Sequence, residues 1–310
     1  MPPKDRLSRK IALMNRSDLS EPPYLPPLPP NPIQVGLIGS GIQASRSPAI
    51  HLHEASVHRL RYSYELIDLD KLGVGPEALP SLLDDAERRG FTGLNVTYPC
   101  KQTVIPLLDD LSPEAEVLGA VNTVVFVNGR RTGHNTDWFG FAESFRRGLS
   151  GAKLRTVVQL GAGGAGAATA YAALTLGVNR LIVFDQEPAR ASALANRLSS
   201  PSAPQRIRPG TALAAALQEA DGLIHATPTG MINHPGLPLP AHLIAPHLWI
   251  AEVVYFPLET ELLKIARQAG CRTLNGGGMV VFQASEAFRL FTGITPDRDR
   301  MLTHFLTLTP

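Results

Sequence analysis

The sequence contains one glycine-rich turn whose spacing suits the binding of a dinucleotide. The turn follows the apolar stretch 156–160 and opens an alanine-rich stretch that ends near residue 176; its residues are Gly161, Ala162, Gly163, Gly164, Ala165 and Gly166. Glycines permit a tight turn and let a pyrophosphate approach backbone N–H groups at a helix N-terminus. Such turns also occur for structural reasons alone, but the strand pattern before this one and the helix pattern after it favour cofactor binding.

An acidic residue, Asp185, ends the next strand pattern at 180–185. A carboxylate there can accept hydrogen bonds from the adenosine ribose hydroxyls and would repel a 2′-phosphate. The alternative is a structural role, in which Asp185 caps the helix whose first turn contains Glu187 and Arg190. One residue can serve both roles.

Polar residues also gather at the ends of strand patterns in the first half of the chain. Thr97 and Lys101 follow the stretch 93–97, Asn122 lies within 119–123, and the segment 134–137 ends in Asp137. Strand-end loops that face a cleft are where α/β proteins place their chemistry. Taken singly, each of these residues is more often a solvated charge or a turn residue.

The elements expected around these residues alternate between strands and helices. In the first half the sequence predicts strands at 35–38, 62–69 and 93–97, helices at 80–89 and near 103–108, and a hairpin at 121–135 around Asn128-Gly129. In the second half it predicts strands at 156–160, 180–185, 222–226 and 249–254, and helices at 138–147, up to 176 and at 280–292. This alternation predicts parallel sheets in two α/β domains with a cleft between them.

The polar segments together resemble the shikimate dehydrogenase family, most of all its quinate/shikimate dehydrogenase branch. The resemblance runs from about residue 33 to the C-terminus and includes Ser45-Arg46-Ser47-Pro48, the glycine-rich turn, residues 227–231, Val253-Val254-Tyr255, and Met279 followed by Gln283. It implies reversible oxidation of shikimate, quinate or both to the 3-dehydro acid, with hydride transfer to a nicotinamide cofactor. The expected fold has a substrate-binding α/β domain (33–137 with 280–310) followed by a Rossmann-like domain (138–279), and the C-terminal helix returns to the first.

The resemblance also implies a role for individual residues. Lys101 and Asp137 match the catalytic lysine and aspartate, and such a pair can hold a substrate hydroxyl and relay its proton. The positions that match substrate-binding residues are Ser45 and Ser47 for the carboxylate, Thr97, Asn122 and Gln283 for ring hydroxyls, and Tyr255, which faces the substrate. Ser47 could instead cap the helix that starts at Pro48. On the cofactor side the matching positions are Thr227, Val253 and Gly276.

Several positions depart from the family's pattern. Asn275 stands where an acid commonly precedes Gly276, His225 where asparagine often precedes Ala-Thr-Pro, and Glu252 where aspartate is common. In the cofactor region, members that use NADP typically present an Asn-Arg-Thr run followed by a further arginine. This chain has Asp185-Gln186-Glu187, which predicts NAD as the preferred cofactor. NADP is the alternative, because Arg180 or Arg190 could swing toward a 2′-phosphate.

Composition excludes several other classes of protein. The chain has 310 residues, 18% of them charged, and a net charge of +2 without the basic stripe that nucleic-acid binding requires. No apolar run reaches the roughly 20 residues that span a bilayer, and the N-terminus lacks a secretory signal. The two cysteines, Cys100 and Cys271, are expected to be reduced, which predicts a cytoplasmic protein. His51 and His53 should point to different sides of a helix, and no cluster has metal-ligand spacing.

Residues 1–32 are rich in proline and form a separate leader. They are expected to be extended or disordered, and the alternative is a ligand for a proline-binding groove. The sequence leaves open whether the protein is a monomer or a homodimer, and which small cyclic polyol carboxylate it takes.

Other functions compatible with the sequence are an aminoshikimate-type dehydrogenase, a ligand-sensing regulator without turnover, and an unrelated dinucleotide-binding reductase that shares only the turn. The intact Lys101 and Asp137 and the lack of a basic DNA-reading helix count against the regulator. The substrate-side motifs count against the unrelated reductase.

Overall fold

The computed structural model describes residues 32–199 and 206–308, so the leader up to residue 31 lies outside the described residues. The chain divides into two compact units. The first unit comprises, of the described residues, 32–136 and 281–308, and the second comprises 137–280. No helix of the described residues is long and apolar enough to cross a membrane.

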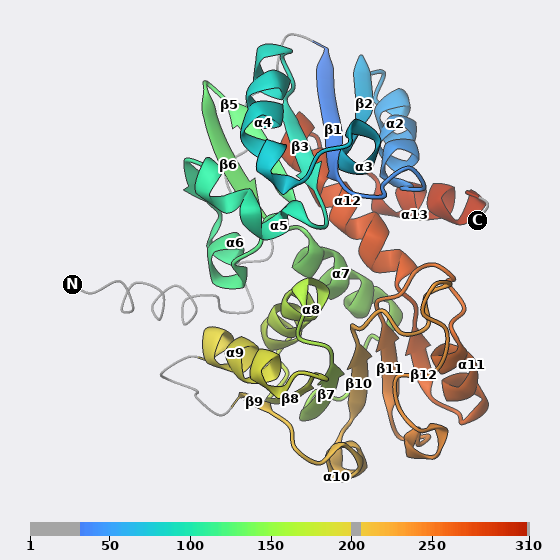
Figure 1. The fold of residues 1–310 in the computed structure, drawn as a ribbon. Coiled ribbons are helices and arrows are strands. Elements are labelled where there is room, and N and C mark those ends of the chain that lie inside the picture. The colour runs from blue at the N-terminus through green and yellow to red at the C-terminus, as the bar shows by residue number, and fades with distance from the viewer. Residues whose placement is uncertain (1–31, 200–205, 309–310) are drawn as a thin grey trace. The chain divides into compact units, whose positions relative to one another are not determined.

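The first unit is built on a six-stranded sheet with the strand order β2-β1-β3-β5-β6-β4 (Figure 1). Its strands are β1 (Ile33–Gly39), β2 (Tyr62–Asp68), β3 (Gly93–Val96), β4 (Asp110–Leu111), β5 (Thr123–Val127) and β6 (Arg130–His134). The sheet is mixed rather than wholly parallel, because β5 runs antiparallel to both β3 and β6. The hairpin of β5 and β6 was predicted, whereas the antiparallel pairing of β5 with β3 was not. The Asn128-Gly129 turn, where φ is 52° and 71°, produces the hairpin of β5 and β6, since two positive φ angles give a tight antiparallel turn.

The helices of the first unit connect these strands. They are α2 (Ser47–Val57), α3 (Leu69–Leu72), α4 (Leu79–Arg88), α5 (Cys100–Thr103), α6 (Pro113–Leu118) and α13 (Arg298–Thr307), together with most of α12 (Gly277–Thr292) and the 3-10 turns η1 (Pro76–Ala78) and η2 (Ile105–Leu107). The helix expected near 103–108 is wrong. The α-helix ends at Thr103 because Pro106 has no N–H to continue it, and a 3-10 turn follows.

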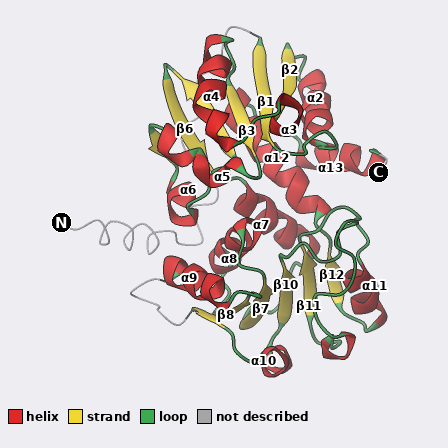
Figure 2. Ribbon diagram, viewed as in Figure 1, coloured by secondary structure: helices red, strands yellow, loops and turns green. Residues whose placement is uncertain are grey.

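Helices cover both faces of this sheet, as Figure 2 shows with strands in yellow and helices in red. Val124 and Val125 are consecutive in β5 and therefore point to opposite faces. Val124 belongs to a buried cluster that includes Leu79 and Leu83 of α4, whereas Val125 belongs to a cluster that includes Phe291 of α12. The core of the first unit thus requires residues from both ends of the described chain.

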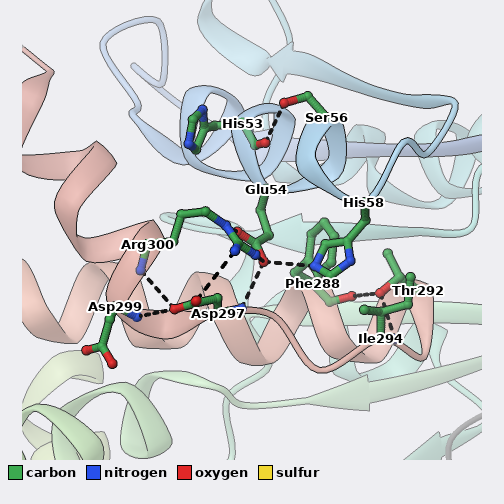
Figure 3. A network of polar contacts seen from close by, with 10 residues as sticks. All are labelled: His53, Glu54, Ser56, His58, Phe288, Thr292, Ile294, Asp297, Asp299 and Arg300. Carbon is green, nitrogen blue, oxygen red and sulfur yellow. Dashed lines mark hydrogen bonds and ion pairs between the residues drawn. The ribbon is translucent and has the colours of Figure 1, made fainter.

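A buried carboxylate fixes helix α2 in this unit (Figure 3). Glu54 is fully buried and accepts hydrogen bonds from Nε and Nη2 of Arg300 at 2.9 and 2.6 Å, and from the backbone N–H of Asp297 at 2.8 Å. His58 lies 3.0 Å away on the other side. The contact ties the middle of α2 to the start of α13.

The second unit contains a six-stranded sheet with the order β12-β11-β10-β7-β8-β9, and every pair in it is parallel. Its strands are β7 (Thr156–Leu160), β8 (Arg180–Phe184), β9 (Ile207–Pro209), β10 (Gly222–His225), β11 (Trp249–Glu252) and β12 (Arg272–Leu274). Its helices are α7 (Asp137–Gly148), α8 (Gly164–Thr175), α9 (Pro188–Leu198), α10 (Leu213–Glu219) and α11 (Glu261–Gln268), with the 3-10 turn η3 (Ala241–Leu243). The chain reverses its direction of winding between β7 and β10, and ligands of such sheets bind outside the carboxyl ends of strands at this switch point.

Candidate active site

The glycine-rich turn lies at the switch point of the second unit, between β7 and α8. Gly161 has φ of 101°, and a side chain there would place Cβ 2.4 Å from the carbonyl oxygen of Ala226, which follows β10. A Cβ at Gly166 would lie 2.2 Å from the carbonyl oxygen of Gly161. Gly163 and Gly164, in contrast, have nothing within 4 Å of an added Cβ. Close packing therefore explains why Gly161 and Gly166 are glycines. Gly163 and Gly164 leave the backbone accessible at a helix N-terminus, where a pyrophosphate could bind.

Gln159, in β7, stabilises the glycine-rich turn through its side chain. Its buried side-chain amide donates to the carbonyl oxygens of Gly161 and Gly166 at 2.9 and 2.7 Å, and its Oε1 accepts from the hydroxyl of Thr169 at 3.0 Å. The sequence gives no signal for this role, because a glutamine in a strand pattern is recognisable as a core residue only when its partners are known.

Asp185 follows the carboxyl end of β8 and is bound to the glycine-rich turn. Its Oδ2 accepts from the N–H of Ala162 at 2.8 Å, and its Oδ1 accepts from the N–H of Glu187 at 3.0 Å. Asp185 is not the N-cap residue of α9, because Glu187 occupies that position and its side chain makes no capping hydrogen bond. Asp185 nevertheless accepts from the N–H of Glu187, so it also supports the start of the helix. A carboxylate has about four acceptor positions, so two remain for hydroxyl groups of a ligand.

The two arginines near this region differ in position. Arg190 forms an exposed ion pair with Glu187 at 2.8 Å in the first turn of α9. Arg180 opens β8, at the opposite end of the strand from Asp185, and there contacts Thr156 and Glu219. A strand of this length spans about 16 Å, so the expectation that Arg180 could reach the same phosphate as Arg190 is wrong.

Val253 and Gly276 are packed together at the carboxyl ends of β11 and β12. A Cβ on Gly276 would lie 2.2 Å from the carbonyl oxygen of Val253, so only glycine permits this approach. Thr227 is half-buried in the loop after β10, and Tyr255 is 41% exposed in the loop after β11. The cofactor-side residues inferred from the family thus all follow carboxyl ends of strands in one parallel sheet.

A continuous polar network links the substrate-side residues of the first unit. Asn122 Oδ1 accepts from the backbone N–H of Thr136 at 2.7 Å, and the Thr136 hydroxyl lies 3.3 Å from Oε1 of Gln283. On its other side, Asn122 Oδ1 accepts from the hydroxyl of Thr123, which in turn accepts from the amide of Asn95 at 3.1 Å. The network therefore runs from β3 to α12.

Tyr64 extends this network to Ser47. The Tyr64 hydroxyl donates to Asn95 Oδ1 at 2.9 Å and also forms a hydrogen bond with the Ser47 side chain. Burial raises the pKa of Tyr64 far above its ordinary value, so its hydroxyl stays protonated and can donate. Tyr64, Asn95 and Thr136 were not identified as site residues from the sequence. Tyr64 lies in β2, far along the chain from the motifs, and the roles of Asn95 and Thr136 depend on partners that only the fold brings together.

The serine-containing loop before α2 is held by Asp68. The hydroxyl oxygen of Ser45 accepts from the N–H of Ser47 at 3.3 Å. Asp68, at the end of β2, accepts from the side-chain amide of Gln43 at 2.7 Å and from the N–H of Gly41 at 3.2 Å. The hydrogen bond from Gln43 is the main cause that lowers the pKa of Asp68. The alternative that Ser47 caps α2 is wrong, because Ser47 is the first helical residue and the N-cap position is occupied by Arg46, whose side chain does not cap the helix.

Thr97 and Lys101 flank the start of α5. The N–H of Thr97 donates to Ile38 of β1, and the carbonyl oxygen of Lys101 accepts from Val121 at 2.8 Å. Val121 precedes Asn122, whose side chain holds Thr136, and Asp137 is the next residue and begins α7. These contacts bring the three polar segments together around Asn122.

The histidines near these residues differ in exposure, since His51 is fully buried whereas His53, His134 and His304 are partly buried. Burial lowers the pKa of His51 to about 3 and that of His134 to about 4, so both are neutral at neutral pH. His53 stacks on His304 at 3.9 Å between ring centroids. Within residues 32–199 and 206–308, no group of three or more His, Cys, Asp or Glu residues is placed to hold a metal. Cys100 and Cys271 are both buried free thiols.

The parallel sheet of the second unit, with its glycine-rich turn and following acid, is that of a dinucleotide-binding α/β protein. A family model for the shikimate dehydrogenase substrate binding domain matches residues 37–124. A shikimate dehydrogenase (NADP(+)) from Streptomyces avermitilis is 61% identical over 277 residues, which cover 88% of this chain and 95% of the relative. A quinate/shikimate dehydrogenase (NAD(+)) from Corynebacterium efficiens is 47% identical over 279 residues, covering 89% and 98%.

Solved structures agree with this relationship. A quinate dehydrogenase from Corynebacterium glutamicum in complex with NAD superposes with a TM-score of 0.83 at 45% identity, covering 89% of this chain and 99% of the other. The chain belongs to the shikimate dehydrogenase family. The resemblance inferred from the sequence and the two-domain α/β fold class are thereby confirmed. The relatives carry both NAD(+) and NADP(+) in their names, so the choice between the two cofactors requires an argument from this chain's own residues.

Proposed function

We propose that this protein catalyses the reversible oxidation of shikimate, quinate or both to the corresponding 3-dehydro acid, with NAD as the preferred cofactor. The observation that carries the proposal is the network around Asn122, which joins the segments of Lys101, Thr136 and Gln283 in one unit. The two curated relatives and the solved structure described above match the chain over nearly their whole length, and they are named as shikimate or quinate dehydrogenases.

The first unit (residues 32–136 and 281–308) is the substrate-binding domain in this proposal. Ser45 and Ser47 bind the carboxylate of the substrate, and Thr97, Asn122 and Gln283 bind its ring hydroxyls. Tyr255 is the remaining residue that faces the substrate in this proposal. Because Tyr64 and Thr136 hold Ser47, Asn122 and Gln283 in one hydrogen-bonded chain, these polar groups are oriented before a substrate arrives. Preorganised polar groups bind a small hydroxylated acid with little loss of side-chain entropy.

Lys101 and Asp137 carry the proton transfer. The bound nicotinamide supplies the hydride acceptor. Lys101 holds the hydroxyl that becomes the carbonyl and takes up its proton, and Asp137 orients the ammonium group and stabilises its charge. The two groups act as one coupled pair, so removing either disables both.

The second unit is the cofactor-binding domain, and its residues fit NAD. The open backbone at Gly163 and Gly164 leaves room for the pyrophosphate, and Asp185 keeps acceptor positions for ribose hydroxyls. Thr227, Val253 and Gly276 lie on the side of the nicotinamide. A 2′-phosphate of NADP would meet the carboxylates of Asp185 and Glu187, and Arg190 is already paired with the latter. These charges favour NAD.

Rates measured with each combination of substrate and cofactor test the proposal. The reduced nicotinamide is followed by its near-ultraviolet absorbance, with shikimate or quinate as substrate and NAD or NADP as cofactor. We expect turnover with at least one of the two acids, and a kcat/KM for NAD about tenfold or more above that for NADP, a difference of ~1.4 kcal/mol. Binding of shikimate without turnover in any combination would indicate a ligand sensor instead.

A further inference from the structure

The second unit contains a buried pair of polar side chains, a histidine and a glutamate, that the proposed reaction does not use. His225 ends β10 and Glu252 ends β11, and both side chains are fully shielded from solvent. His225 Nδ1 lies 2.8 and 2.9 Å from the two carboxylate oxygens of Glu252. An ionised carboxylate can only accept, so the proton of the ring lies on Nδ1 and is shared between both oxygens.

Glu252 also binds the loop that follows its own strand. Its Oε1 accepts from the N–H of Val254 at 2.9 Å, and its Oε2 accepts from the hydroxyl of Thr260 at 3.2 Å. Thr260 is the N-cap of α11. Through these bonds the carboxylate fixes the backbone at Val254, between Val253 and Tyr255, and the side chain that caps α11.

The other nitrogen of His225 binds the loop after β10. Its Nε2 lies 2.5 Å from Oγ1 of Thr227. With the ring proton on Nδ1, Nε2 accepts the hydroxyl proton of Thr227, and Oγ1 accepts from the N–H of Thr229 at 3.3 Å. The direction of the Thr227 hydroxyl is therefore set by the ring of His225.

We propose that His225 is a positioning residue, which Glu252 orients and which in turn aims Thr227 at the nicotinamide side of the cofactor. The inference rests on the proposed function, since it assumes that Thr227 contacts the cofactor. The pair joins the loops after β10 and β11, and Ala226, next to His225, is in close contact with Gly161 of the glycine-rich turn. One buried contact thus couples the three loops of the cofactor-binding edge.

A purely structural role is the competing explanation. Buried pairs of charged groups contribute little to stability compared with apolar residues of the same size, because both groups lose their hydration. A pair placed only for stability would have no reason to lie at the cofactor edge and to contact Thr227 through its free nitrogen. Two substitutions separate these roles, because each keeps one half of the imidazole's contacts.

His225→Asn and His225→Gln form the matched pair. In H225N the Asn amide can take the place of Nδ1 and keep the hydrogen bond to Glu252, but the hydrogen bond to Thr227 is lost. In H225Q the Gln amide can take the place of Nε2 and keep the hydrogen bond to Thr227, but the hydrogen bond to Glu252 is lost. We expect H225N to raise the Kd for NAD roughly five- to tenfold, as for the loss of one hydrogen bond. H225Q should retain a Kd near that of the wild type and lower the Tm more than H225N does.

Calorimetric titration of the full chain with NAD, without substrate, measures these constants. Thr227→Val should raise the Kd for NAD in the wild-type background. It should raise the Kd little further in the H225N background, because His225 acts on the cofactor only through Thr227. Asp221→Asn is the control for destabilisation. Asp221 directly precedes β10, at the opposite end of the strand from His225, and binds Arg155. Its substitution should lower the Tm and leave the Kd for NAD unchanged.

The outcomes distinguish failure of this inference from failure of the proposed function on which it rests. If H225N and H225Q change the Kd equally, or if the effects of H225N and T227V add in full, His225 supports only the fold and the inference is overturned. If the wild type binds NAD but T227V has no effect in it, Thr227 does not contact the cofactor and the inference fails while the function stands. If the wild type binds no nicotinamide cofactor, the proposed function itself fails.

Discussion

The carboxylate of Asp185 accepts a hydrogen bond from the backbone N–H of Ala162, at 2.8 Å from Oδ2 to N. The acid that would bind the ribose is thus attached directly to the turn that would bind the pyrophosphate. We therefore expect a change at Asp185 to affect the choice of cofactor and the geometry of the turn together.

Replacing Asp185 with Asn and Gln186 with Arg should narrow or reverse the preference for NAD. The double variant removes one of the carboxylates that repel a 2′-phosphate and adds a guanidinium, and the Asn side chain can still accept from Ala162. Steady-state kcat/KM with NAD and NADP at matched subsaturating concentrations measures the ratio. Arg180→Ala is the control and should leave the ratio unchanged, because Arg180 lies at the other end of β8. A wild type that already prefers NADP would show that Asp185 does not select the cofactor.

The glycines of the turn should separate into two classes. Gly161→Ala should lower the Tm strongly, because φ is 101° and Cβ would lie 2.4 Å from a backbone oxygen. Gly163→Ala should leave the Tm nearly unchanged, because φ is −75° and nothing lies within 4 Å of the new methyl group. The same G163A variant should raise the Kd for NAD, since the methyl group would occupy the space in which the pyrophosphate binds. Tight NAD binding by G163A would place the pyrophosphate elsewhere.

Lys101→Ala and Asp137→Asn should each reduce kcat by about 10² to 10⁴, the range for a positioned acid–base group. The double variant should be little worse than the worse single one, because the two groups act as a unit. Glu116→Gln, an acid on the nearby helix α6, is the control for a general change of charge. A near-normal kcat with a raised KM in K101A would make Lys101 a binding residue and contradict the proposed proton transfer.

Stability at low pH should depend on Glu54. Burial raises the pKa of this carboxyl, but the hydrogen bonds from Arg300, Asp297 and His58 outweigh it and leave the pKa below its ordinary value. The hydrogen bonds therefore contribute their full stabilisation at pH values above the pKa of the carboxyl in the unfolded state, about 4.3. This contribution is lost as the pH falls through the lower pKa of the carboxyl in the folded state. We expect Glu54→Gln to lower the free energy of unfolding by about 1 to 3 kcal/mol at neutral pH, and less near pH 3.

Urea denaturation at several pH values measures this dependence. Glu65→Gln breaks the exposed ion pair with Arg89 and serves as the matched control, with an expected cost of about 0 to 1 kcal/mol. Equal losses in the two variants would mean that the contacts in Figure 3 add nothing beyond a surface pair.

Much of the fold could be predicted from the sequence because its signals are local. Asn128-Gly129 specifies its hairpin, and the apolar stretch before Gly161 specifies β7. The antiparallel pairing of β5 with β3 was nevertheless missed, since alternation along the chain indicates which elements exist but not which strands become neighbours. Helix α13 was missed as well, because much of its attachment comes from Arg300 reaching Glu54, nearly the whole chain away.

The candidate site likewise contains residues that could be predicted from the sequence and residues that could not. Motif residues such as Asn122 and Gln283 could be selected from the sequence, whereas Tyr64 and Gln159 could not. Their importance depends on hydrogen-bond partners that the fold brings together, and a polar residue inside a strand pattern gives no sign of which partner it will meet.

The discontinuous path of the first unit has a consequence for how the protein is made. Val35 and Val125 are synthesised early, but Phe291 and Ala287, which cover them, are synthesised near the end. On the ribosome the second unit can complete its sheet while one face of the first remains uncovered. A nascent chain released before residue 291 would expose that apolar face, so early termination should yield a product that aggregates or binds chaperones rather than a folded half-enzyme.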